Sequence, residues 1–257
     1  MPAPEYSALD LALEAVRWDE YERGLRRDNR HVPNDSKYFD ELFFGCLACG
    51  VTLPAETSLY RARIMPPDQE TDTEPLPMAE MGQPPSDRTP DGRVNPAGIP
   101  CFYAALEIAT AIAELRPWPR ARLTVGTFVT AGPFKMLDLR PAHEEVQKSR
   151  AVSWAAYMIS RPVHRDDRFG YLGTQYLAER LKAAGTTGLL YESQLLPGGT
   201  NVALFTDSGL RPTGASLHEV TGVTYSSIFL TPTHSIGKLL AEMRKNPTKE
   251  NPSEKTS

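Results

Sequence analysis

The sequence predicts an α+β protein, in which a mixed β-sheet carries flanking helices and a helical segment precedes the first strand. Strand-like and helix-like segments follow one another without the regular strand–helix alternation that is typical of a doubly wound sheet. The 257 residues are 40% hydrophobic and 23% charged, which is enough apolar material for one large core. No internal repeat divides the chain.

The N-terminal part, residues 1–56, is predicted to form a helical annex. The first helix is expected over residues 6–23, where apolar side chains recur at the spacing of one helix face: Tyr6, Leu9, Leu13 and Val16. Gly24 is the predicted end of this helix. A second helix is predicted over residues 37–47, so two helices precede the first strand.

The first strand is predicted over residues 59–64, where side chains alternate between two faces. One face carries Tyr60, Ala62 and Ile64, and the other carries Arg61 and Arg63. Residues 65–92 then change in character, because prolines recur among Asp, Glu, Gln and Ser. This composition predicts a loop or a partly disordered insertion, and long loops of this kind often act as lids.

A turn-rich segment, residues 92–98, leads to a helix predicted over residues 104–115. Its core face is expected to hold Ala104, Ile108, Ala111, Ile112 and Leu115. Glu107 and Glu114 share the flank of that face, and Glu114 lies in the last turn, where the helix dipole disfavours a carboxylate by about 0.3–1 kcal/mol. Such exceptions are more common at functional sites, although an exposed ion pair with Arg116 is an alternative explanation.

The rest of the chain continues the mixture of strands and helices. Further strands are predicted over residues 122–130, 134–138, 187–192, 201–205 and 223–230, and further helices over 174–184 and 236–244. The core domain is therefore expected to span residues 57–245, and the polar residues 246–257 are expected to form a disordered tail.

Four other side chains can join Glu114 in a site. Arg61 lies on the polar face of its strand and Arg93 lies in the turn, and two guanidiniums can hold a diphosphate through bidentate contacts. Tyr103, expected at the entrance of the Glu114 helix, can stack on a flat heterocycle. Ser193 follows an apolar strand, so its hydroxyl leaves the sheet there. Each residue also has a structural explanation: a salt bridge, a core edge or a strand cap.

The cysteines are interpreted as part of the core. Cys46 and Cys49 form a CxxC pair in an apolar run, and a zinc site would need two more ligands. Cys101 and His31 are the available candidates, but their spacing fits no zinc pattern, so no metal site is expected. No catalytic triad arrangement and no glycine-rich nucleotide motif is present.

Charge and hydropathy argue against two classes of partner. The net charge of −4 gives no field toward nucleic acid, and the longest apolar run, residues 43–53, is shorter than a membrane helix. The N-terminus lacks the pattern of a signal peptide, and the odd number of cysteines indicates reduced thiols. A cytoplasmic protein that binds neither nucleic acid nor membrane is therefore expected.

Four segments together resemble the RES domain family, which is named for its Arg, Glu and Ser. The family pattern is a Tyr–Arg strand, a GRxN turn, an aromatic residue before the Glu, and a strand-end Ser before a glycine–asparagine loop. The matching segments are Leu59–Arg63, Gly92–Asn95 with Gly98, Cys101–Ala104 leading to Ala113–Glu114, and Gly188–Ser193 with Gly199, Asn201 and Phe205. They cover roughly residues 58–210.

This resemblance implies a fold like that of the ADP-ribosyltransferases, with a split mixed sheet around a cleft for NAD. It implies NAD as the substrate, with no further cofactor, and a toxin that degrades NAD by hydrolysis or phosphorolysis. The family motif implies catalytic roles for Glu114, Arg61 and Ser193, and NAD-binding roles for Arg93, Tyr103, Tyr60 and Asn201. The implied partners are NAD, inorganic phosphate, a cognate antitoxin or immunity protein, and a second copy of the chain.

Two alternatives stay open at this point. The chain can transfer ADP-ribose to a protein target, but such transferases often carry an acidic residue two positions before the catalytic Glu, where this chain has Ile112. The second alternative is a non-catalytic module whose helical annex binds a partner. The annex, the proline-rich insertion and the extended C-terminal part distinguish this chain from the short toxins of the family.

Overall fold

The computed structural model describes residues 6–31, 33, 35–69, 73–163, 167 and 169–225. The helix predicted over 236–244 and the tail from 246 lie outside the described residues. Of the strand predicted over 223–230, residues 223–225 are described, and they have no regular secondary structure.

Helices and strands alternate irregularly along the chain, as the sequence predicts. The helices are α1 (Ala8–Arg27), α2 (Ser36–Ala48), α3 (Met78–Met81), α4 (Ile108–Ala113), α5 (Glu144–Lys148), α6 (Arg150–Ser160) and α7 (Leu172–Ala183). The strands are β1 (Gly50–Leu53), β2 (Ser58–Ile64), β3 (Phe102–Ala105), β4 (Arg122–Thr130), β5 (Phe134–Asp138), β6 (Gly188–Glu192), β7 (Thr200–Leu204) and β8 (Leu210–Glu219). Single 3₁₀ turns cover Pro67–Gln69 and Ser86–Arg88.

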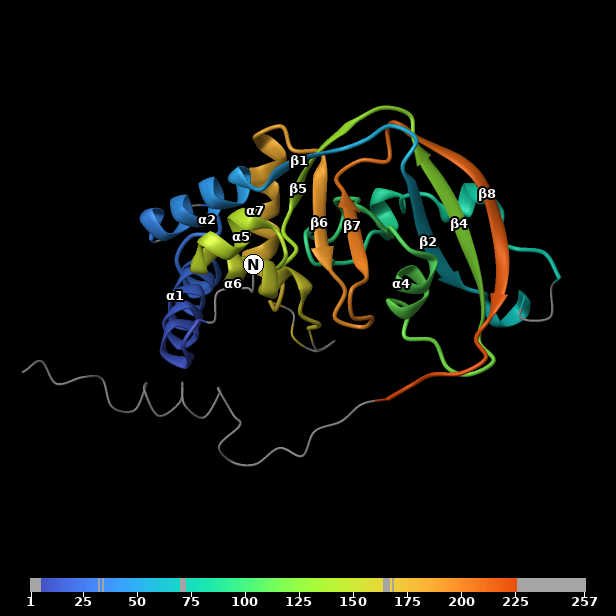
Figure 1. The fold of residues 1–257 in the computed structure, drawn as a ribbon, viewed down its shortest axis with the longest axis horizontal. Coiled ribbons are helices and arrows are strands. Elements are labelled where there is room, and N and C mark those ends of the chain that lie inside the picture. The colour runs from blue at the N-terminus through green and yellow to red at the C-terminus, as the bar shows by residue number, and fades with distance from the viewer. Residues whose placement is uncertain are drawn as a thin grey trace, which may run out of the picture.

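The strands form one sheet of eight in the order β1-β5-β6-β7-β3-β2-β4-β8. The β5–β6 pair is parallel and its neighbours are antiparallel, so the predicted mixed sheet of an α+β protein is confirmed. β2 pairs with β4 along its whole length, whereas its described pairing with β3 is limited to Tyr60 and Ala105. The sheet therefore splits between β2 and β3 (Figure 1).

The two halves of the sheet are covered differently. α1, α2, α5, α6 and α7 gather beside the β1-β5-β6-β7 half, and α4 lies at the boundary between the halves (Figure 1). The largest core cluster joins the two N-terminal helices to the rest, since Trp18 and Tyr38 pack in it with Ile159 of α6 and Leu177 of α7. The annex thus shares its core with the domain that follows, and β1 adds an edge strand to the sheet.

Helix α1 differs from its prediction in two ways. It continues through the predicted stop at Gly24 to Arg27, because Leu25 is buried in the core. The predicted apolar face is wrong: Leu9 and Leu13 are 64% and 46% exposed, whereas Trp18 and Tyr21 are buried. Trp18 and Tyr21 pack in the core cluster that α1 shares with α6 and α7, and large aromatic side chains gain much from burial, so they orient the helix.

The helix predicted over 104–115 is divided in the structure. Ala104 and Ala105 belong to β3, where they pair with Val202 and Asn201 of β7. α4 begins only after Glu107, so Glu107 and Glu114 lie at opposite ends of a short helix instead of on a shared flank. Pairing with β7 makes residues 104 and 105 a strand, because apolar alanines fit either a helix or a buried strand.

The insertion over residues 65–92 contains the short helix α3 and two 3₁₀ turns, and it packs on the sheet where it is described. Leu76 and Met81 are buried in the cluster that covers β2, and Arg63 donates a hydrogen bond to the carbonyl of Gly82. The predicted core position of the cysteines is confirmed: Cys46, Cys49 and Cys101 are free and buried. Burial raises the pKa of the Cys49 and Cys101 thiols to about 12.

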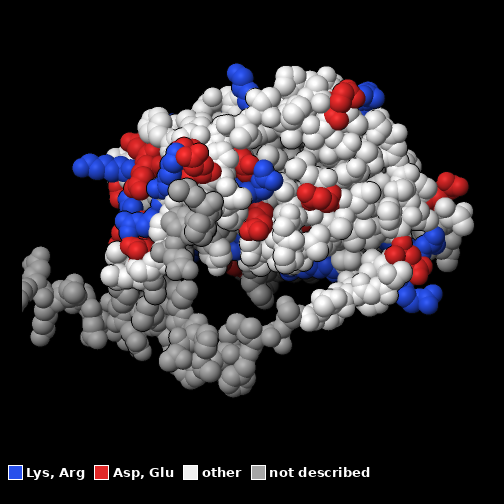
Figure 2. All heavy atoms as spheres, in the orientation of Figure 1, with Lys and Arg blue, Asp and Glu red and all other residues white. Residues whose placement is uncertain are grey.

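Acidic and basic side chains are mixed over the helical end of the face in Figure 2. The ion pairs of helix α1 include Arg17 with Glu41 and Arg23 with Asp19. No group of His, Cys, Asp and Glu in the described part of the chain could hold a metal ion. Among those residues, none of the helices is long and apolar enough to cross a membrane.

Candidate functional site

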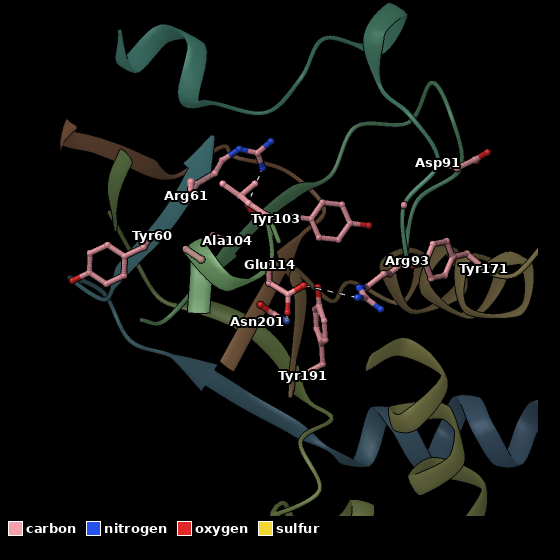
Figure 3. Close-up of a pocket in the computed structure, with 14 residues that line it drawn as sticks. Tyr60, Arg61, Asp91, Arg93, Tyr103, Ala104, Glu114, Tyr171, Tyr191 and Asn201 are labelled. Carbon is pink, nitrogen blue, oxygen red and sulfur yellow. Dashed lines mark hydrogen bonds and ion pairs between the residues drawn. The ribbon is translucent and has the colours of Figure 1, made fainter. Parts of the chain in front are cut away.

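A pocket opens where β2 and β3 separate, and it has a volume of about 370 Å³. Small-molecule sites usually measure about 300–1,000 Å³. Its walls come from β2, β3, the turn at residues 91–93, α4, β7 and two tyrosines, Tyr171 and Tyr191. Figure 3 shows Glu114 and Arg93 directed toward one another across it. The split in the sheet thus creates the space for a ligand.

Glu114 caps the C-terminus of α4, and neighbouring strands hold its carboxylate in place. Its Oε1 accepts hydrogen bonds from Ser193 Oγ and from Asn201 Nδ2, both at 2.7 Å. Its Oε2 lies 3.9 Å from Nη2 of Arg93, and the Glu114 side chain is 25% exposed. The described ion pair of Glu114 is therefore with Arg93, and the alternative pairing with Arg116 is wrong.

Arg93 is held by the end of helix α6. Its Nη1 donates to the carbonyls of Ile159, Ser160 and Arg161, at 3.1, 2.9 and 2.5 Å. A guanidinium is stabilised at this position, because the last carbonyls of a helix carry partial negative charge. The Nη2 group is left facing Glu114 and the pocket.

Two tyrosine rings lie on either side of the Arg93 guanidinium. The ring centres of Tyr171 and Tyr191 are each 5.9 Å from its central carbon. Burial raises the pKa of Tyr191 above its usual value, so the phenol stays neutral and offers Arg93 an aromatic face. Neither residue is among the site residues predicted from the sequence. Tyr191 lies two positions before Ser193, so strand periodicity places both on one face.

Tyr103 lies on β3 and not at the start of a helix. Its hydroxyl donates to Asn95 Oδ1 at 2.7 Å and accepts from the backbone N–H of Val94 at 3.1 Å. Burial raises the pKa of Tyr103 well above its usual value, so the hydroxyl retains its proton. The ring forms part of the pocket wall, while the hydroxyl fixes the turn that carries Arg93.

Gly92 has no room for a side chain in this turn. A Cβ atom at this position would lie 2.3 Å from Asn95 Oδ1 and 2.5 Å from the Tyr103 hydroxyl. We expect Gly92→Ala to break the Tyr103–Asn95 bond, displace Arg93 and lower ligand binding, with a loss of stability of about 1–3 kcal/mol. Thermal melts and ligand titration measure both effects. Gly132→Ala is the control, because a Cβ there meets nothing within 4 Å, and equal losses in both variants would contradict the prediction.

Arg61 crosses the split in the sheet. Its Nη1 donates to the carbonyl of Tyr103 at 2.8 Å, and its buried Nε has no hydrogen-bond partner. Burial lowers the pKa of Arg61 to about 10, and the neighbouring Arg63 adds to this effect. In Figure 3 the Arg61 guanidinium lies apart from the Glu114–Arg93 pair. No ion pair of Arg61 is found in the described part of the chain, so an anion entering the pocket can pair with it.

The structure brings the residues singled out in the sequence to one place. Six of the seven predicted site residues line the pocket: Tyr60, Arg61, Arg93, Tyr103, Glu114 and Asn201. Ser193 contacts the pocket through its hydrogen bond to Glu114. Tyr171 had no signal in the sequence, because its place in the pocket depends on how α7 packs.

A comparison with protein-family models matches the RES domain over residues 58–219. The chain belongs to the RES domain family. The matched region runs from β2 to β8 and contains every site residue named above, whereas α1, α2 and β1 precede it.

Comparisons with individual proteins add little to this assignment. A search of curated proteins finds no match. Among solved structures, the RES domain chain is similar to one described as the crystal structure of the M. tuberculosis MbcT–MbcA toxin–antitoxin complex. The identity is 17%, the TM-score is 0.42, and the alignment covers 80% of this chain and 98% of the other.

Proposed function

We propose that this RES domain protein degrades NAD by cleaving the bond between nicotinamide and ribose, as a glycohydrolase or a phosphorylase. One observation carries the proposal: the Glu114 carboxylate, fixed by Ser193 and Asn201, faces Arg93 across a pocket at the split of the sheet. The RES family resemblance supplies NAD as the substrate that fits this combination of groups.

Cleavage of this bond passes through a transition state in which the ribose carries positive charge. The nicotinamide leaves as a neutral molecule, so the reaction needs a negative charge beside the ribose more than it needs a general acid. Ser193 and Asn201 hold Glu114 in position before the substrate arrives. A carboxylate oriented in advance stabilises the developing cation without reorganisation during the reaction.

The two arginines suit the diphosphate of NAD. Arg93 directs Nη2 into the pocket, and Arg61 is a buried cation whose Nε lacks a partner. Phosphate oxygens accept paired hydrogen bonds from guanidinium groups, which would satisfy both side chains. The site therefore combines a positive region for the diphosphate with one carboxylate for the ribose, and Tyr60 and Tyr103 supply aromatic walls.

The acceptor distinguishes the two reactions. In hydrolysis, a water oxygen bonds to the ribose carbon as nicotinamide leaves, and the products are ADP-ribose, nicotinamide and a proton. In phosphorolysis, a phosphate oxygen takes that place and the product is a phosphorylated ADP-ribose. Glu114 would orient either acceptor, and the two arginines would bind inorganic phosphate as well as the diphosphate of NAD.

Transfer of ADP-ribose to a protein is the weaker alternative. The position two residues before Glu114 holds Ile112, which packs against the apolar cluster around Ala111 and Leu123. The pocket therefore has no second acidic group at that position to activate a protein acceptor.

The family resemblance also suggests the biological role of the protein. We propose a toxin whose NAD breakdown is held in check by an antitoxin or immunity protein. The three buried, free cysteines fit a reducing compartment such as the cytoplasm.

Incubation of the purified protein with NAD, with and without inorganic phosphate, tests the proposal. Hydrolysis gives ADP-ribose in both buffers, phosphorolysis gives the phosphorylated product only with phosphate, and transfer leaves ADP-ribose attached to a protein side chain. Mass spectrometry identifies each product. Intact NAD in both buffers, with a protein that melts cooperatively, would refute NAD breakdown and favour the non-catalytic interaction module.

A further inference from the structure

The turn that carries Arg93 is held from the first turns of α7. Thr174 Oγ1 donates to the carbonyl of Arg93 at 2.5 Å. Gln175 Nε2 donates to the carbonyls of Gly92 and Asn95, at 2.9 and 3.1 Å. Three backbone carbonyls of a four-residue turn therefore depend on two neighbouring side chains of α7. The position of the Arg93 backbone follows the position of this helix.

The start of α7 is in turn held by α1. The hydroxyl of Tyr21 donates to the carbonyl of Gly173 at 2.9 Å, and this bond is buried. Burial raises the pKa of Tyr21 well above its usual value, so the hydroxyl keeps the proton that it donates. A Cβ at Gly173 would lie 2.9 Å from the side chains of both Trp18 and Glu22, so the backbone of α7 packs directly against side chains of α1 at this point. Gly173 immediately precedes Thr174, which binds the Arg93 carbonyl.

The guanidinium of Arg93 also depends on the N-terminal helices. It binds the last carbonyls of α6, and α6 packs against both α1 and α2. The contact with α2 is tight, since a Cβ at Gly45 would lie 2.4 Å from the Val152 side chain. Both the backbone and the side chain of Arg93 are therefore supported by helices that rest on residues 8–48.

We propose that the N-terminal helices, which lie outside the matched RES region, form part of the scaffold of the ligand site, and that Tyr21 is a positioning residue for Arg93. The path runs from Tyr21 through Gly173 and Thr174 to the Arg93 turn. The ligand group that Arg93 would bind is an anionic phosphate, and this identity rests on the proposed function. The mechanical coupling rests only on the contacts within the protein.

Tyr21→Phe in the full chain tests the coupling, because it removes the hydroxyl and keeps the ring in the core. Tyr6→Phe is the matched control: it also removes one tyrosine-to-carbonyl bond of 2.9 Å, from Tyr6 to Gln147, away from the Arg93 turn. We expect Tyr21→Phe to speed amide hydrogen exchange in residues 92–98 of the free protein. The KM for NAD should rise about tenfold with kcat within about twofold, since displacing a binding group weakens binding in the ground state and the transition state alike.

Thr174→Val gives a second measurement, because it cuts the same path one step closer to Arg93. It should reproduce the faster exchange at residues 92–98. Unchanged exchange in both Tyr21→Phe and Thr174→Val would overturn the coupling, as would equal effects in Tyr6→Phe. If the wild-type protein leaves NAD intact, the proposed function fails, but hydrogen exchange in the free protein still decides whether Tyr21 positions Arg93.

Discussion

We expect Glu114→Gln to lower the rate of NAD cleavage by about 10²–10³-fold, the usual cost of removing one electrostatic stabiliser of a transition state. The fold should be retained, because the amide oxygen of Gln can still accept the hydrogen bonds from Ser193 and Asn201 that Oε1 accepts now. The amide nitrogen then replaces Oε2 in front of Arg93, so the negative charge disappears from the pocket.

Initial rates of nicotinamide release at saturating NAD measure this effect, with a thermal melt to verify folding. Glu107→Gln is the matched control, since Glu107 caps the other end of the same helix and binds Thr110 and the backbone of Thr200. Its rate should stay near that of the wild type. A Glu114→Gln protein with wild-type turnover would remove Glu114 from the chemistry and, with it, the main support for the proposed mechanism.

We expect the second large effect from Arg93→Ala, which should weaken both ligand binding and the stability of the fold. The carbonyls of Ile159, Ser160 and Arg161 lose their shared charged donor, which costs about 1.5–3 kcal/mol of the free energy of unfolding. The pocket also loses the cation that faces Glu114. The proposed charge pair between Arg93 and the diphosphate of NAD is lost. Removing one partner of a desolvated charge pair costs about 2–5 kcal/mol, so the Kd for NAD should rise at least about thirtyfold.

Calorimetric titration of NAD into a catalytically silent Glu114→Gln background measures the affinity, and chemical denaturation measures the stability. Arg211→Ala is the control, because Arg211 pairs with Glu56 at an exposed site. That pair should contribute at most about 1 kcal/mol. Wild-type affinity in the Arg93→Ala protein would show that the arginine serves α6 alone and that the ligand is anchored elsewhere.

Several strands of the sheet were predictable from sequence because their patterns are local, whereas residues 104 and 105 of β3, which lines the pocket, were predicted as part of a helix. β2, β4 and β6 show period-two or continuous apolar segments bounded by turn residues, and their predicted bounds agree with the structure to within a residue. β8 was missed because Pro212 and Gly214 weaken a strand signal. Both are tolerated, since β8 is the edge of the sheet and needs a partner only in β4.

The helices show where local patterns are insufficient. α6 is buried along most of its length and was missed, although its last carbonyls hold Arg93. The orientation of α1 was wrong because leucines and aromatic residues offer two competing apolar faces, and only packing against α6 and α7 selects one. The same packing places Tyr171 beside Arg93.

From the sequence alone, the α+β class, the family and seven residues at the pocket could be predicted, with Glu114 at the C-terminal end of a helix, whereas Tyr171 and Tyr191 could not. Only the tertiary structure shows which contacts those residues make with one another. Ser193 and Asn201 reach Glu114 from 79 and 87 positions away, and Arg93 binds carbonyls 66–68 positions away. Periodicity records only which face of an element is apolar, whereas these contacts depend on how β6, β7, α4 and α6 pack around the split in the sheet.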